Sequence, residues 1–172
     1  MSARILIALA QGEGLPEVAE AFADGARPRS GDVRIAGLGA LLQDGGRAAL
    51  QEIERCDALA IGTPAAAGAP ATEVMELLAL TEPLWSGGRL HDKAVTVFTD
   101  HPEVPAPDAV ISPIYSALYH WGAVVVGPRD FELPLAGMPD ARTAAARYRG
   151  RRLAHLAAAL AAARAELGRL QL

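Results

Sequence analysis

The stretch Asp57-Ala-Leu-Ala-Ile-Gly-Thr63 is a short and nearly continuous apolar run. A strand with one solvated face alternates apolar and polar residues, whereas a strand that is buried on both faces is apolar almost throughout. Strands of the second kind occur in parallel sheets that carry helices on each side. Residues 57–63 therefore predict a buried strand of an α/β protein.

Comparable runs occur before and after residues 57–63, and helical patterns separate them. Strands are expected at residues 4–10, 32–37, 93–99 and 123–126, and helices at 16–25, 47–56, 72–80, 112–121 and 140–168, the last as one or two helices. Strands that alternate with helices pair in parallel through right-handed crossovers. The sequence predicts a three-layer, doubly wound sheet of five parallel strands, and residues 1–172 are expected to form a single domain.

Composition and charge argue against several classes of protein. The chain has 16 basic and 20 acidic residues, a net charge of −4 and no basic stripe, which disfavours nucleic-acid binding. No apolar run reaches the roughly 20 residues that span a bilayer, and the N-terminal run lacks the features of a signal peptide, so we expect a cytoplasmic protein without a membrane segment. Cys56 is the single cysteine and is expected to be a buried thiol, not a nucleophile.

The fold class itself selects the candidate site. Ligands of doubly wound sheets bind beyond the carboxyl ends of the strands. This rule selects three loops, which run from Gln11 to Leu15, from Pro64 to Pro70 and from Asp100 to Asp108. We expect a small-molecule substrate to bind where these loops meet.

Several motifs between residues 57 and 156 are typical of one family. They are Gly62-Thr-Pro64 with Gly68, Leu84-Trp85 with Gly88, Leu90 and Lys93, Val97-Phe98-Thr99, Leu118-Tyr-His120-Trp-Gly122, Ala141-Arg142, and Arg149-Gly150-Arg-Arg-Leu-Ala154. On these residues the chain resembles the flavodoxin-like NAD(P)H:quinone oxidoreductases, the tryptophan-repressor-binding-protein family. The resemblance implies a flavodoxin-like strand order of 2-1-3-4-5, FMN at the strand edge, electron transfer from NAD(P)H to a quinone or flavin, and a homo-oligomer, either a dimer or a tetramer.

The same resemblance places the cofactor contacts in the three loops and at one later histidine. The expected FMN-binding residues are Gln11, Gly12, Glu13, Gly14, Leu15, Pro64, Ala65, Ala66, Ala67, Gly68, Thr99, Asp100, His101 and His120. His120, His101, Asp100 and Glu13 are the candidate catalytic residues, because imidazole and carboxylate groups transfer protons. The loop after Thr99 has no regular ligand spacing, so no metal ligand is assigned.

The three loops also depart from the family pattern. Glu13 adds an anion beside the expected phosphate position, and Pro16 lacks one N–H donor. Ala65-Ala66-Ala67 stands where the family has an arginine and an aromatic residue. Three functions therefore stay open: an FMN-dependent oxidoreductase, an enzyme without FMN whose acid/base groups are Glu13, Asp100, His101 and Glu103, and a non-catalytic assembly protein.

Overall fold

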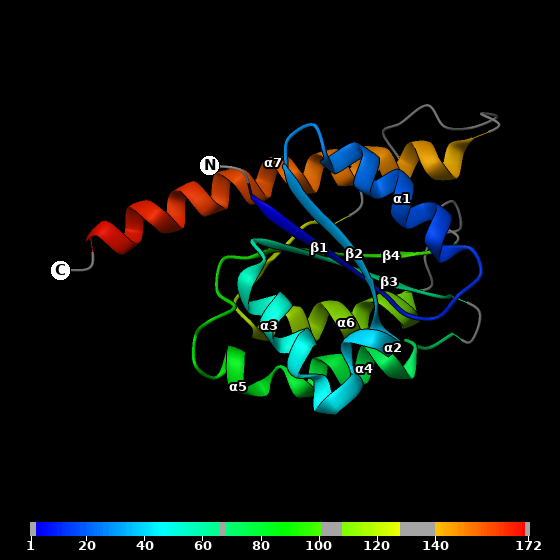
Figure 1. The fold of residues 1–172 in the computed structure, drawn as a ribbon, viewed down its shortest axis with the longest axis horizontal. Coiled ribbons are helices and arrows are strands. Elements are labelled where there is room, and N and C mark those ends of the chain that lie inside the picture. The colour runs from blue at the N-terminus through cyan, green and yellow to red at the C-terminus, as the bar shows by residue number, and fades with distance from the viewer. Residues whose placement is uncertain (1–2, 66–67, 101–107, 128–139, 171–172) are drawn as a thin grey trace.

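The computed structural model describes residues 3–65, 68–100, 108–127 and 140–170. Its strands form one sheet of five parallel strands in the order β2-β1-β3-β4-β5, which confirms the predicted fold and strand order (Figure 1). The strands are β1 (Arg4–Leu9), β2 (Asp32–Gly37), β3 (Ala58–Thr63), β4 (Ala94–Thr99) and β5 (Val124–Val125). The five predicted strands are therefore present, although β5 is shorter than expected.

Helices cover both faces of the sheet, as Figure 1 shows. They are α1 (Leu15–Ala26), α2 (Leu38–Leu41), the 3-10 helix η1 (Gln43–Gly46), α3 (Arg47–Arg55), α4 (Thr72–Leu80), α5 (Glu82–Trp85), α6 (Asp108–His120) and α7 (Ala141–Leu170). The five predicted helices are all present, and the last region is a single helix of 30 residues. The short elements α2, η1 and α5 were not predicted.

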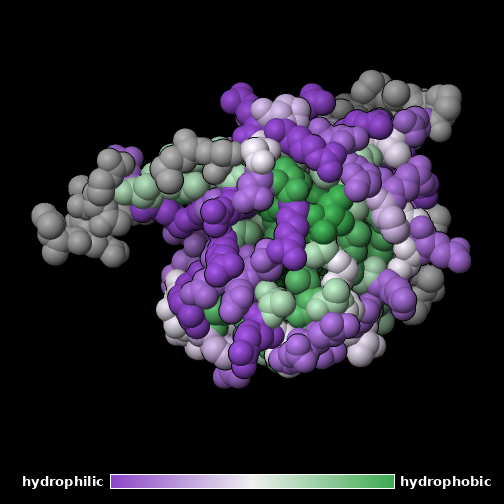
Figure 2. Space-filling view, in the orientation of Figure 1, coloured by the Kyte–Doolittle hydropathy of each residue, from purple (hydrophilic) through white to green (hydrophobic). Residues whose placement is uncertain are grey.

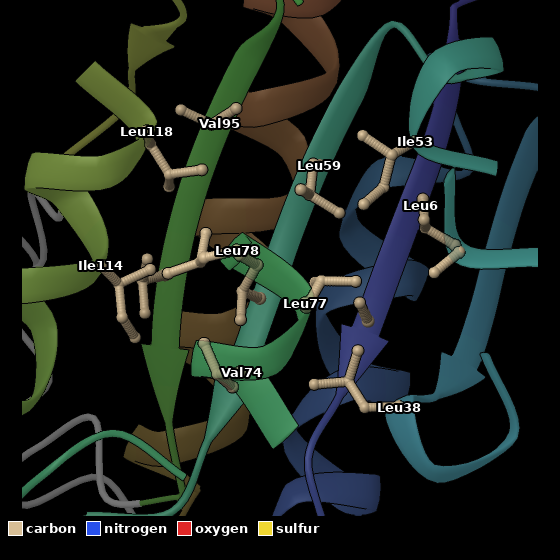
Figure 3. Close-up of a cluster of buried hydrophobic side chains, with 14 of the residues drawn as sticks. Leu6, Leu38, Ile53, Leu59, Val74, Leu77, Leu78, Val95, Ile114 and Leu118 are labelled. Carbon is tan, nitrogen blue, oxygen red and sulfur yellow. The ribbon is translucent and has the colours of Figure 1, made fainter. Parts of the chain in front are cut away.

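Strands β3 and β4 are buried along their whole length, as the apolar run in 57–63 predicted. Their side chains alternate between two cores. Leu59 and Ile61 face the core under α3, α4 and α6, while Ala58 and Ala60 face the core under α1 and α7. Figure 3 shows the first core, where leucine, isoleucine and valine side chains from the helices meet those of the strands.

Strand β2 forms one edge of the sheet and is more exposed than the others. Asp32 to Ile35 alternate between exposed and half-buried, and Val33 and Ile35 pack against the core under α1 and α7. Ala36, near the end of the strand, is half-buried against the opposite core. Figure 2 shows one face of the molecule, with hydrophobic residues near its centre and hydrophilic residues around them.

Helices α1 and α7 approach each other closely because a glycine on each helix faces the backbone of the other. A Cβ atom on Gly25 would overlap the carbonyl group of Arg147, and its distance to the Arg147 Cα would be 2.8 Å. A Cβ atom on Gly150 would overlap the carbonyl group of Phe22 in the same way. Only glycine fits at these two positions, since real Cβ atoms do not approach backbone so closely.

The far half of α7 runs beyond the sheet (Figure 1) and is held there by Arg164. The guanidinium donates from Nη2 to Asp57 Oδ1 at 2.6 Å and from Nη1 to the Asp92 carbonyl at 2.6 Å. The second carboxylate oxygen of Asp57 accepts from the Arg4 N–H at 2.9 Å. One partly buried carboxylate thus ties α7 to the beginnings of β1 and β3.

Lys93 and Cys56 lie together at the amino ends of the strands. Lys93 Nζ donates to the carbonyl oxygens of Glu54, at 2.9 Å, and of Cys56. Burial lowers the pKa of Lys93 and raises the pKa of the Cys56 thiol to about 11. The thiol is buried, as predicted, and it is protonated at neutral pH. Over the described residues, no helix is long and apolar enough to cross a membrane.

Candidate functional site

The three predicted loops meet at the carboxyl edge of the sheet. Asp100, directly after β4, accepts through Oδ1 the N–H of Ala65 at 3.0 Å, so the loops after β3 and β4 are joined. A Cβ atom on Gly14 would lie 3.2 Å from the Cβ of Asp100, and one on Gly12 would lie 3.4 Å from the Cβ of Pro64. The loop after β1 therefore contacts both other loops.

The beginning of α1 presents unpaired amide groups at this edge. Gly14 is the N-cap residue, and no side chain caps the helix. Within the part of the chain that the structure describes, the N–H groups of residues 12–15 donate to no acceptor. Such groups and the helix dipole attract an anion. Glu13 is exposed, and Pro16 removes only one donor of the first turn.

A cation reaches the same place from the opposite end of the chain. Arg142, in the first turn of α7, donates through Nη2 to Glu17 Oε2, although the two residues are 125 positions apart in sequence. Its other terminal nitrogen, Nη1, would lie 3.5 Å from a Cβ atom on Gly14. The side chain of Arg142 is 32% exposed. Positive charge is thus held beside the amide groups of the first loop.

Glu73, in the first turn of α4, fixes the first loop from the other side. Its Oε2 accepts the N–H of Gln11 at 2.9 Å. Glu73, Gln11 and Gly12 line a hollow of about 390 Å3 that extends past Gly37 at the end of β2 and Gly39 in α2. The amide of Gln11 is therefore already satisfied, and the free donors of this loop begin at Gly12.

Thr63 and Thr99 are paired neighbours at the ends of β3 and β4. Thr63 Oγ1 accepts the N–H of Ala71 at 3.1 Å, which fixes the beginning of α4. Thr99 is buried, and its Oγ1 has no hydrogen-bond partner among the described residues. Buried hydroxyl groups are normally satisfied, so Thr99 leaves a donor and acceptor open at this edge.

The structure does not bring His120 to the three loops. His120 is the last residue of α6, and the strand that follows pairs Val124 with Ala94, the first residue of β4. The residue is exposed and lies at the amino edge of the sheet, opposite the loops after Thr99. The predicted contact between His120 and a cofactor held by these loops therefore does not fit the direction of α6.

Several other predicted residues fall outside the description. Ala66, Ala67, His101 and Glu103 lie outside the described residues, as does the side chain of Asp108. Gly68 is exposed, has a left-handed φ of +66° and donates to the Ala65 carbonyl at 3.4 Å. Among the described residues, no three His, Cys, Asp or Glu side chains converge as they would around a metal ion.

Solved structures with the same fold include flavin-related proteins. A flavodoxin, WrbA-like protein from Agrobacterium tumefaciens superposes with a TM-score of 0.66 at 18% identity, covering 91% of this chain and 98% of that one. An NAD(P)H:quinone oxidoreductase from Methanothermobacter marburgensis gives a TM-score of 0.57 at 17% identity, covering 89% and 96%. At this level of identity the likeness establishes the flavodoxin-like fold.

Comparison of sequences shows the relationship more directly. No family model matches the chain. A curated protein from Syntrophobacter fumaroxidans, NAD(P)H dehydrogenase (quinone), is 31% identical over an alignment of 132 residues, which covers 63% of this chain. The chain is thus similar in sequence to an NAD(P)H dehydrogenase (quinone), and its fold is flavodoxin-like. It spans just under two thirds, 65%, of the length of that curated protein.

Three residues beside the candidate site were not among the predicted site residues. Arg142, Glu17 and Glu73 surround the first loop, but two of them come from helices that follow later in the chain. The motif Ala141-Arg142 was part of the family resemblance but did not place Arg142 at the site, because only the close crossing of α1 and α7 brings it to Gly14. An acidic residue in the first turn, such as Glu17 or Glu73, is common at helix beginnings and carries no specific signal.

Proposed function

We propose that this chain is an FMN-dependent oxidoreductase that transfers electrons from NAD(P)H to a quinone or a flavin. The row of unpaired amide groups at residues 12–15 is the observation that supports it best, because these groups form an anion site at the carboxyl edge of a flavodoxin-like sheet. The name of the similar Syntrophobacter protein, NAD(P)H dehydrogenase (quinone), agrees with this proposal.

The described residues fit the phosphate end of FMN. The amide groups of Gly12 to Leu15 would donate to the phosphate oxygens, and the helix dipole of α1 adds to the attraction. Glu13, which carries the opposing charge, is exposed and has room to point into solvent. Thr99 Oγ1 offers a further hydroxyl that no described residue uses.

In this proposal the protein positions the flavin and excludes water from it. Asp100 holds the second loop through the Ala65 N–H and keeps it against Gly14. Pro64 to Gly68 and Thr99 to His101 are proposed to frame the ring of the flavin. FMN, when bound, supplies the hydride and electron transfer itself.

Proton transfer at this edge is assigned to groups beside the loops. Asp100 and Glu13 lie there, and His101 follows Asp100 directly in the chain. Side chains of these types exchange protons with a substrate within hydrogen-bond reach. His120 is not included, because α6 carries it to the opposite edge of the sheet.

Binding of FMN is the direct test. The purified protein, mixed with FMN, is expected to quench the flavin fluorescence and to retain one FMN per chain after gel filtration. Oxidation of NADH or NADPH by an added quinone should then depend on the bound flavin. A protein that neither quenches nor retains FMN at micromolar concentration contradicts the proposal. The alternatives are then an enzyme without FMN whose acid/base groups are Glu13, Asp100, His101 and Glu103, or a non-catalytic assembly protein.

The assembly and location of the protein stay predictions. A homo-oligomer, dimer or tetramer, is expected from the family resemblance, and the chain presents apolar side chains that such an assembly would cover. Tyr119 is 75% exposed and Trp85 is 38% exposed. Large exposed apolar side chains of this kind are common at interfaces between subunits. We also propose that the protein is cytoplasmic.

A further inference from the structure

We propose that Arg142 is the residue by which this protein distinguishes FMN from unphosphorylated flavin. The inference rests on the proposed function, because it assigns the phosphate of FMN a partner in α7. None of the three loops at the strand edge provides this partner. It comes from the beginning of the last helix, which crosses α1.

The position of Arg142 is set by Glu17, and its other terminal nitrogen lies near Gly14. Glu17 accepts from Nη2 and holds the guanidinium on the first turn of α1. Nη1 is directed differently, toward Gly14, where the distance to an added Cβ would be 3.5 Å. A guanidinium can donate from separate nitrogens to two acceptors, so Arg142 can remain on Glu17 while Nη1 donates to a phosphate oxygen.

The local charge explains why an arginine is needed at this place. Glu13, Glu17 and Asp100 all lie at or next to the first turn of α1, and FMN adds a phosphate with further negative charge. The loop has none of the hydroxyl side chains that would share the phosphate oxygens. The amide groups alone do not compensate the negative charge of the phosphate and the nearby carboxylates. A charge-assisted hydrogen bond from Arg142 offsets it.

The crossing of α1 and α7 makes this arrangement rigid. Gly25 and Gly150 let the helix backbones touch, so the first turn of α7 is held at a set distance from α1. Arg142 is only one-third exposed, and the pair it forms with Glu17 limits its rotamers. A cation that is already positioned binds an anion with less loss of side-chain entropy.

The test compares FMN with riboflavin, which lacks the phosphate, by fluorescence titration of the full-length protein. The substitution Arg142→Gln is expected to raise the dissociation constant for FMN about tenfold or more and to change that for riboflavin less than twofold. The matched control is Arg151→Gln, an exposed arginine on the same helix, which should leave both constants unchanged. Thermal unfolding of each variant reports whether the fold is intact.

The dependence on salt provides a second measurement that needs no variant. Raising the ionic strength should weaken binding of FMN by the wild-type protein and leave binding of riboflavin unaffected. Equal affinity of the wild type for FMN and riboflavin, or an Arg142→Gln variant that keeps the wild-type preference, overturns the role of Arg142 while the proposed function stands. A wild-type protein that binds neither flavin overturns both.

Discussion

Replacing Gly150 with alanine is expected to lower the free energy of unfolding by roughly 3 kcal/mol, because the new methyl group would overlap the backbone of α1. Its Cβ would lie only 2.8 Å from the carbonyl carbon of Phe22 and 3.2 Å from the Phe22 ring. Backbone cannot rotate away as a side chain can, so α1 and α7 must move apart. The direction of the effect is diagnostic, since alanine in an open helical position is favoured over glycine by about 1 kcal/mol.

Urea denaturation of the purified variants measures this effect. A suitable control is Gly39→Ala in α2, where the new Cβ meets only Glu73 Oε1 at the ordinary distance of 3.6 Å, so stability should be unchanged or slightly higher. Gly25→Ala should lower the free energy of unfolding as much as Gly150→Ala. The double variant should lose less than the sum of the two single variants, because one shift of α7 relieves both steric overlaps. Wild-type stability of Gly150→Ala would contradict the close crossing.

The second large effect is expected for Phe98→Ala, which should lower the free energy of unfolding by about 3–5 kcal/mol. Phe98 is fully buried in β4 and stacks on Phe22 of α1, with ring centroids 5.4 Å apart and planes at 19°. It also fills the space above Gly62, where an added Cβ would lie 2.8 Å from its Cζ. Removal of the ring leaves a cavity between the sheet and α1 at the strand ends that carry the site.

A double-mutant cycle separates the stack from simple burial. Phe98→Ala, Phe22→Ala and the double variant are unfolded in urea, and the coupling free energy between the rings is expected to be about 0.5–1.5 kcal/mol. Phe98→Leu is the matched control, because it keeps most of the apolar volume and should be clearly less destabilising than alanine. If Phe98→Ala lowers the free energy of unfolding by less than about 1 kcal/mol, this core is not closely packed.

Much of the fold could be predicted from the sequence because it depends on local periodicity. The apolar runs at 57–63 and 93–99 mark strands that are covered on both faces, and β3 and β4 are buried at every residue. Helices α2 and α5 have four residues each, too few to show a helical period. Strand β5 is limited to two residues, and nothing in the apolar run at 123–126 indicates where its pairing ends.

The site was predictable only in part. The rule for doubly wound sheets selected the loops at the carboxyl edge, and the structure shows that Asp100, Ala65 and Gly14 do lie together there. Arg142 could not be found in this way, because its place depends on a tertiary crossing. His120 was assigned from a motif, yet the direction of α6 determines where the residue lies, and the motif does not contain that information.

Because Lys93 is buried, cleavage at this residue can be used to follow opening of the protein. Lys93 is the single lysine of the chain, so a protease specific for lysine has one target bond, Lys93–Ala94, at the beginning of β4. A protease needs an extended, accessible segment, and this bond lies inside the sheet, paired with β3 and β5. Fraying of the helix ends or loops leaves it intact. The rate of cleavage by such a protease therefore reports opening of the central sheet itself.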